Sequence, residues 1–149
     1  MQTVLWTLLG IIAGACIATQ SPINVQLGKG FGLPIAAAAM SFLAGAIILW
    51  VVTFVVSRVQ GSPINFGGPA PWLFVTGGAL GTVYVTSSVF LTPMIGATAV
   101  MGLSIAGQLL AGLTLDRIGF MGMAVREITL GRAAGAALLV AGAIMIRVL

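Results

Sequence analysis

The chain has 149 residues, of which 60% are hydrophobic and 5% are charged, and six Lys and Arg residues against two Asp and Glu residues give a net charge of +4. A soluble domain carries about 25% charged residues, so this chain cannot cover itself with polar groups and its surface must face lipid. This excludes a soluble enzyme, a disordered chain and a nucleic-acid-binding protein. With one cysteine and no histidine, we expect no internal disulfide, no metal site and no cofactor.

The charged residues divide the chain into uncharged stretches, and a helix needs about 20 apolar residues to cross the hydrocarbon core. The stretches 1–28 and 30–57 each provide one span, and 59–115 provides two with a turn in the segment Leu91-Thr92-Pro93-Met94-Ile95-Gly96. The last stretch spans the membrane if Arg132 and Arg147 reach opposite interfaces. The sequence therefore predicts a single all-α integral membrane domain over residues 1–149 with five transmembrane helices, at 3–27, 34–57, 71–91, 95–115 and 131–148.

The basic residues suggest an orientation for these spans. An odd number of spans places the termini on opposite sides, and the N-terminus then shares its side with the loops 58–70 and 116–132. That side carries four basic residues and the other side two. The excess favours a cytoplasmic N-terminus. The four residues are Arg58, Arg117, Arg126 and Arg132, and the other two are Lys29 and Arg147.

A polar segment in the first span contains a proline. Pro22 removes a backbone donor and disfavours helix at Ser21, so we expect the first helix to be broken near Pro22. Broken helices at membrane depth line wet cavities and substrate sites, which makes Gln20 and Asn24 candidates for substrate binding. Alternatively, Pro22 marks an early helix end and Asn24 lies at the interface.

Two further polar pairs occur at helical spacing. Tyr84 and Ser88 lie four residues apart in the third span, and Ser104 and Gln108 lie four apart in the fourth, so each pair shares a face. A buried amide such as that of Gln108 needs partners, which another helix or a substrate can supply. We predict no catalytic residues and no metal ligands. The predicted substrate-binding residues are Gln20, Asn24, Tyr84, Ser88, Ser104 and Gln108.

The two acidic residues, Asp116 and Glu127, fall in the predicted 116–130 loop, where we expect surface ion pairs with the neighbouring Arg117 and Arg126. The 21 glycines are about twice the usual ~7% share. Several small residues lie four apart, a spacing that lets helix backbones approach closely. These pairs are Gly10/Gly14, Ser41/Gly45, Gly77/Gly81, Gly102/Ala106 and Gly131/Gly135.

A set of short motifs follows the predicted helices in a fixed order. They are Asn24-x-x-Leu27-Gly28-Lys29, Gly32-x-Pro34, Ser41-Phe42-x-x-Gly45, Pro71-Trp72, Gly77-Gly78-x-x-Gly81, Leu91-Thr92-Pro93, Gly96-Ala97, Gly107-Gln108-Leu109, Asp116-x-x-Gly119 and Arg132-x-x-Gly135. In these motifs the chain resembles the YdcZ-type branch of the drug/metabolite transporter superfamily. The resemblance implies a multi-pass protein of the bacterial inner membrane, equal to half of an inverted-repeat ten-helix transporter. It further implies an antiparallel dimer, either a homodimer or a heterodimer with a sister chain.

These observations lead to one functional prediction and one alternative. We expect a secondary transporter or facilitator of a small polar or zwitterionic metabolite that works by alternating access. Its partners are then the lipid bilayer, the small-molecule substrate and a second five-helix chain, with no nucleic acid. The alternative is a non-transporting membrane scaffold subunit of a partner transporter. A membrane enzyme is disfavoured because the spans contain no acid–base pair.

Overall fold

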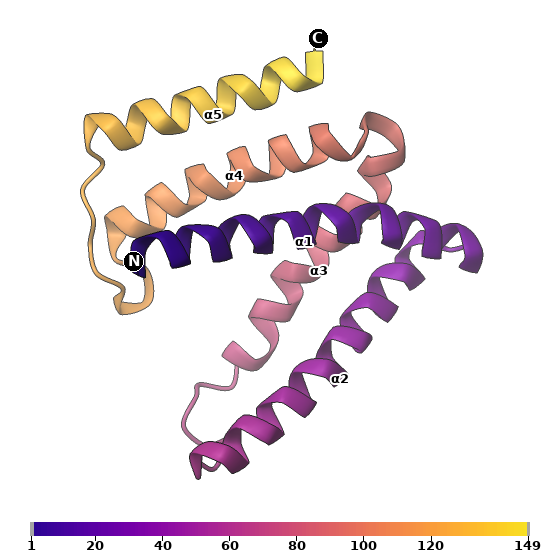
Figure 1. Ribbon diagram of the computed structural model, residues 1–149, viewed down its shortest axis with the longest axis vertical. Coiled ribbons are helices and arrows are strands. Elements are labelled where there is room, and N and C mark those ends of the chain that lie inside the picture. Colours follow the sequence, from indigo (N-terminus) through magenta and orange to yellow (C-terminus); the bar gives the residue numbers. More distant parts are fainter. Residues whose placement is uncertain (1, 149) are drawn as a thin grey trace. The chain divides into compact units, whose positions relative to one another are not determined.

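In the computed structural model, which describes residues 2–148, the described elements are all helical (Figure 1). The five long helices are each long and apolar enough to cross a membrane. This confirms the prediction of an all-α integral membrane protein with five spans. The helices are α1 (Gln2–Phe31), α2 (Pro34–Gln60), α3 (Leu73–Ile95), α4 (Ala97–Ile118) and α5 (Leu130–Val148), with a short 3-10 helix η1 (Phe120–Gly122) between α4 and α5.

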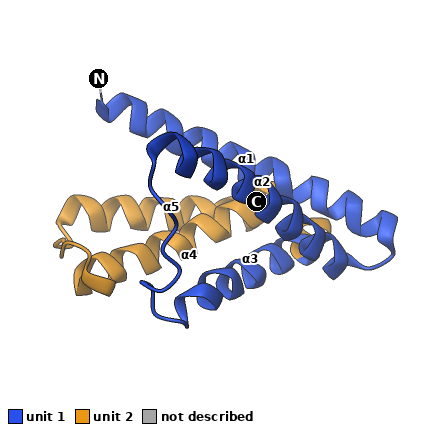
Figure 2. Ribbon diagram, turned by 90° about the horizontal axis from the view of Figure 1, so that it is seen from below, with its two compact units in different colours: residues 1–90 blue, residues 91–149 orange. Residues whose placement is uncertain are grey.

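The chain divides into two compact units, residues 1–90 and 91–149, and the division falls within α3 (Figure 2). In unit 1, α1 and α2 pack against each other next to the turn that joins them and diverge away from it (Figure 1). In unit 2, α4 and α5 pack as a helical hairpin. Each unit therefore contains one helix pair that is adjacent in the sequence.

The first helix is not broken at Pro22, so that part of the prediction is wrong. α1 runs without interruption from Gln2 to Phe31 with Pro22 in its interior. Breaking the helix would leave several backbone N–H and C=O groups unpaired in lipid, whereas an interior proline removes one hydrogen bond. In addition, Ser21 is buried and bonded to Ser88 of α3, which holds the backbone just before the proline in place.

The turn expected in the segment from Leu91 to Gly96 lies at the last residue of that segment. α3 continues through Pro93 to Ile95, and the chain turns at Gly96. Gly96 has φ +82° and ψ 154°, a conformation that side chains with a Cβ rarely adopt. The glycine, rather than the proline, therefore separates α3 from α4.

Small residues bring helix backbones close together in each unit. In unit 1, a Cβ built on Gly28 of α1 lies 3.1 Å from the Pro34 Cα and 3.6 Å from the Ala37 Cβ of α2. In unit 2, a Cβ on Gly102 of α4 lies 3.4 Å from the Ala143 Cβ of α5. These approaches gain van der Waals contact between helix backbones, the main source of attraction between helices in lipid.

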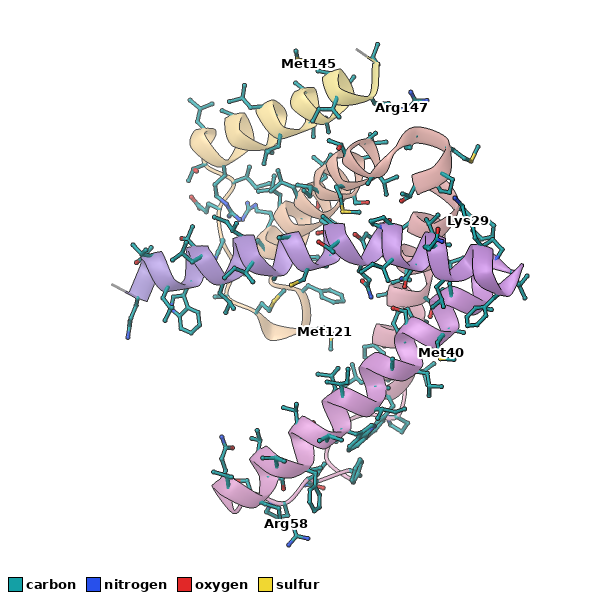
Figure 3. The ribbon with its side chains drawn as sticks, turned by 45° about the vertical axis from the view of Figure 1, so that its right-hand side comes forward. Lys29, Met40, Arg58, Met121, Met145 and Arg147 are labelled. Atoms are coloured by element: carbon teal, nitrogen blue, oxygen red, sulfur yellow. The ribbon has the colours of Figure 1, made fainter. Side chains whose placement is uncertain are left out.

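Large apolar side chains cover the outside of the helices. Among residues 2–148 none of the large side chains is completely buried, and the buried hydrophobic residues are alanines and valines. Figure 3 shows Lys29, Arg58 and Arg147 near the ends of their helices, α1, α2 and α5. The apolar lengths between these charged ends therefore face lipid or another chain.

Candidate functional site

Polar side chains from α1, α2 and α3 meet inside unit 1. The Gln20 Nε2 donates a hydrogen bond of 2.9 Å to the Ser41 Oγ. The hydroxyls of Ser21 and Ser88 share a hydrogen bond of 2.7 Å, and both residues are buried. The first bond joins α1 to α2 and the second joins α1 to α3. We call these four residues, with Asn24 and Tyr84, the polar cluster.

The helical repeat explains why these residues gather. Gln20, Ser21 and Asn24 fall on one side of α1, because residues three and four apart are neighbours on a helix. Tyr84 and Ser88 are related in the same way on α3. Tyr84 packs against the small apolar core formed by Ala38, Val85 and Val89, so the cluster lies directly beside that core.

A hollow of about 410 Å³ opens next to the polar cluster. Gln20 of α1, Ser41 of α2 and Tyr84 of α3 contribute an amide and two hydroxyl groups to a wall that is otherwise apolar. Ligand sites commonly have this composition, in which a few polar groups fix the orientation of a solute held by apolar contacts. The apolar lining residues are Ile17, Phe42, Gly45, Ala46, Leu49 and Val85.

One buried polar atom in unit 1 lacks a hydrogen bond within the described part of the chain, the Thr86 Oγ1 on α3. Unpaired polar groups are costly at membrane depth, so this hydroxyl calls for a partner such as water, a solute or another chain. Asn24 is 4% exposed, but its amide is not among the fully buried groups without a partner.

Of the six residues predicted from the sequence, four belong to unit 1. Gln20 and Tyr84 line the hollow, Ser88 bonds to Ser21, and Asn24 is buried. The other two belong to unit 2, where Ser104 is half-buried and Gln108 is exposed on α4.

Sequence reasoning missed two members of the polar cluster. Ser21 was treated only as the residue weakened by Pro22, and Ser41 only as a packing residue. A signal was present for Ser21, because it lies three residues before Asn24 and so shares a helix side with it. Ser41 could not be paired with Gln20 without knowing how α1 and α2 cross.

The sequence analysis also misplaced Asp116 and its ion-pair partner. Asp116 lies in the last turn of α4, not in a loop, and its partner is Arg132 of α5 instead of Arg117 or Arg126. The Arg132 Nη2 donates to the Asp116 Oδ2, and the Arg132 Nη1 donates to the Glu127 carbonyl at 3.1 Å. A carboxylate at a helix C-terminus and a guanidinium at a helix N-terminus both oppose the helix dipole, so each offsets the other's unfavourable position.

A second hollow, of about 370 Å³, lies beside this ion pair between α4 and α5. Gln108, Gly112 and Asp116 of α4 line it together with Arg132 and Gly135 of α5. The α4 residues are spaced four apart and so share one face of the helix. The hollow therefore extends from the charged ends of the two helices inward to the Gln108 amide.

The sequence matches the protein family described as "Putative inner membrane exporter, YdcZ" over residues 5–145. No curated protein and no solved structure showed a significant match to the chain. The match covers nearly all of the five helices, from the first turns of α1 to the last turns of α5.

Proposed function

We propose that the chain, which belongs to the YdcZ family, is a secondary transporter or facilitator for a small polar or zwitterionic metabolite. The family supports a transport role in the inner membrane, and the composition of unit 1 supports the solute class. The polar cluster offers amides and hydroxyls, and no charged side chain of the described chain lines its hollow. Neutral hydrogen-bonding groups suit a polar solute with no net charge better than a bare cation.

The polar part of the wall of the hollow is the observation that carries this proposal. Gln20, Ser41 and Tyr84 bring an amide and two hydroxyl groups into an otherwise apolar lining, the composition of a site that orients a small polar solute. Asn24 adds a further amide to the polar cluster, one turn from Gln20 on α1. Alternating access then requires the contacts around the cluster to rearrange, which small-residue helix contacts allow.

Flux in proteoliposomes tests this assignment. We expect Asn24→Ala to lower the uptake of a transported solute about tenfold, since a hydrogen bond in a buried site contributes about 1 kcal/mol or more. Thr19→Ala is the matched control, because Thr19 lies on the same helix, is exposed and bonds only to the carbonyl of Ala15 within the described chain. If Asn24→Ala leaves both substrate affinity and flux at the level of Thr19→Ala, the assignment fails.

The proposal includes an antiparallel dimer. The apolar outer faces of α1 and α2 are long and uncovered, and Gly10 and Gly14 of α1 have open space where a Cβ would stand. Both features fit a helix surface that meets a second chain, although lipid also covers such surfaces. Since one five-helix chain would supply half of a ten-helix carrier, a second copy inserted in the opposite orientation is the simplest complement.

Labelling from the two sides of the membrane tests the orientation. Cys16 is the one cysteine of the sequence, so Cys16→Ala gives a background without thiols. Ser62→Cys then places a thiol in the exposed segment between α2 and α3. An antiparallel homodimer predicts that a membrane-impermeant maleimide labels about half of the molecules from outside intact cells and the rest after permeabilisation. Labelling from one side only would contradict a homodimer of this kind.

A further inference from the structure

We propose that the hollow between α4 and α5 binds a zwitterionic solute whose ammonium and carboxylate groups are close together, as in a free α-amino acid. This site shares no residue with the polar cluster of unit 1. It is built around the ion pair of Asp116 and Arg132, which both line the hollow. Binding of a solute to this site can be measured on the purified chain, without a transport assay.

The ion pair is available to a ligand. The side chains of Asp116 and Arg132 remain 32% and 33% exposed. Arg132 donates to the Oδ2 of Asp116. The other carboxylate oxygen, Oδ1, has no hydrogen bond within residues 2–148. A partly exposed ion pair is held weakly, so its members can accept new partners without large loss of stability.

The charges select the ligand class. A solute with an ammonium group beside Asp116 and a carboxylate beside Arg132 completes a square of alternating charges, in which each charge keeps two opposite neighbours. A cation or an anion of the same size would attract one of the two protein charges and repel the other, which is less favourable. Because the protein charges are in direct contact, the two charges of the ligand must also be close together.

The shape of the hollow fits a ligand whose charged groups face the ion pair and whose side chain points into the hollow. Asp116 lies in the last turn of α4 and Arg132 is the third residue of α5, so the charged end of the hollow lies at a membrane surface, where solute enters from water. Gln108 is eight residues before Asp116, which corresponds to about 12 Å along a helix. The side chain of an amino acid bound at the ion pair would therefore extend toward the Gln108 amide.

Two glycines keep the hollow open. A Cβ built on Gly112 or on Gly135 meets no atom within 4 Å, although both residues line the hollow. A larger side chain at either position would occupy the hollow without displacing the neighbouring helix. Gly112→Leu therefore blocks the site while it leaves the ion pair in place. Gly107→Leu is the matched control, because Gly107 also lies on α4 in open space but does not line this hollow.

The test is binding of the standard α-amino acids to the purified protein in detergent, first by thermal shift and then by calorimetry for the tightest binder. We expect its methyl ester, which is a cation, and its N-acetyl derivative, which is an anion, each to bind at least about tenfold more weakly. Asp116→Asn and Arg132→Gln should weaken binding by a similar factor. Gly112→Leu should abolish it, with a melting temperature equal to that of Gly107→Leu.

Three results would overturn the inference: no amino acid binds at millimolar concentration, the ester or acetyl derivative binds as tightly as the zwitterion, or Gly112→Leu binds as well as Gly107→Leu. The Gly112→Leu arm remains informative if removal of a charge unfolds the protein. Binding without flux in proteoliposomes would contradict the transporter and leave this site standing. If Gly112→Leu alters neither the flux nor the binding of the same solute, this site is contradicted and the transporter is not.

Discussion

Replacing Gly28 by alanine tests the closest contact between α1 and α2. A Cβ at this position would lie 3.1 Å from the Pro34 Cα and 3.6 Å from the Ala37 Cβ. The first distance is too short for carbon atoms at rest, and a backbone atom of a helix start cannot rotate away as a side chain can. Either α2 shifts as a whole or the strain remains.

The expected change in the free energy of unfolding follows from two opposing effects. Alanine is more favourable than glycine in a helix interior by about 1 kcal/mol, and overpacking of a tight contact costs about 1–3 kcal/mol. Gly30→Ala provides the reference, because Gly30 lies two residues away on the same helix and meets no atom within 4 Å. The helix preference is then shared by both variants and cancels. We expect Gly28→Ala to be about 1–3 kcal/mol less stable than Gly30→Ala.

Equilibrium unfolding in mixed micelles with increasing dodecyl sulfate, followed by far-ultraviolet circular dichroism, measures the difference. Both variants should keep the helix content of the parent protein at the start of the titration. If Gly28→Ala unfolds at the same or a higher dodecyl sulfate fraction than Gly30→Ala, α1 and α2 do not approach each other at Gly28, and the packing argument for unit 1 is refuted.

Two further predictions concern the bonds within each unit. A double-mutant cycle of Ser21→Ala and Ser88→Ala should give a coupling energy of about 0.6 kcal/mol, and at most about 1.7 kcal/mol, in the same unfolding assay, as found for hydrogen bonds between membrane helices; additive effects would contradict a direct bond. Arg132→Gln should lower the free energy of unfolding by about 0.2–1 kcal/mol, as for a partly exposed ion pair. Adding Asp116→Asn should recover part of that loss, whereas a further decrease would show that the two side chains act separately.

The number of spans could be predicted from the sequence because lipid imposes a length on every helix. The positions of Lys29, Arg58 and Asp116, together with the turn that contains Pro93, were sufficient to divide the chain, since few charges are tolerated within a span. The behaviour of Pro22 could not be predicted in the same way. Whether a proline breaks a helix depends on what surrounds it, and the buried Ser21–Ser88 bond is a contact between residues far apart in the sequence.

The charged part of unit 2 shows a second limit. Arg117 and Arg126 are nearer to Asp116 in the sequence than Arg132 is, so proximity along the chain favoured them. The actual partner depends on α4 continuing to Ile118 and on α5 beginning at Leu130. A shift of either helix end by two residues would turn one of the two side chains to another helix face. Such boundaries are set by tertiary packing and turn geometry, which the pattern of charges does not encode.

The weakness of the bonds in the polar cluster is itself relevant to transport. In lipid, apolar side chains gain little by leaving the bilayer for a helix interface, so packing of small residues and a few hydrogen bonds hold the helices together. The Gln20–Ser41 bond is one of these and lies on the wall of the hollow. A solute that accepts a hydrogen bond from the Gln20 amide replaces an interaction of similar strength, so the amide can change partner while α1 and α2 stay folded. A stronger link at this position, such as an ion pair closed off from water, would hold the two helices in one arrangement and oppose the movement that the proposed alternating access requires.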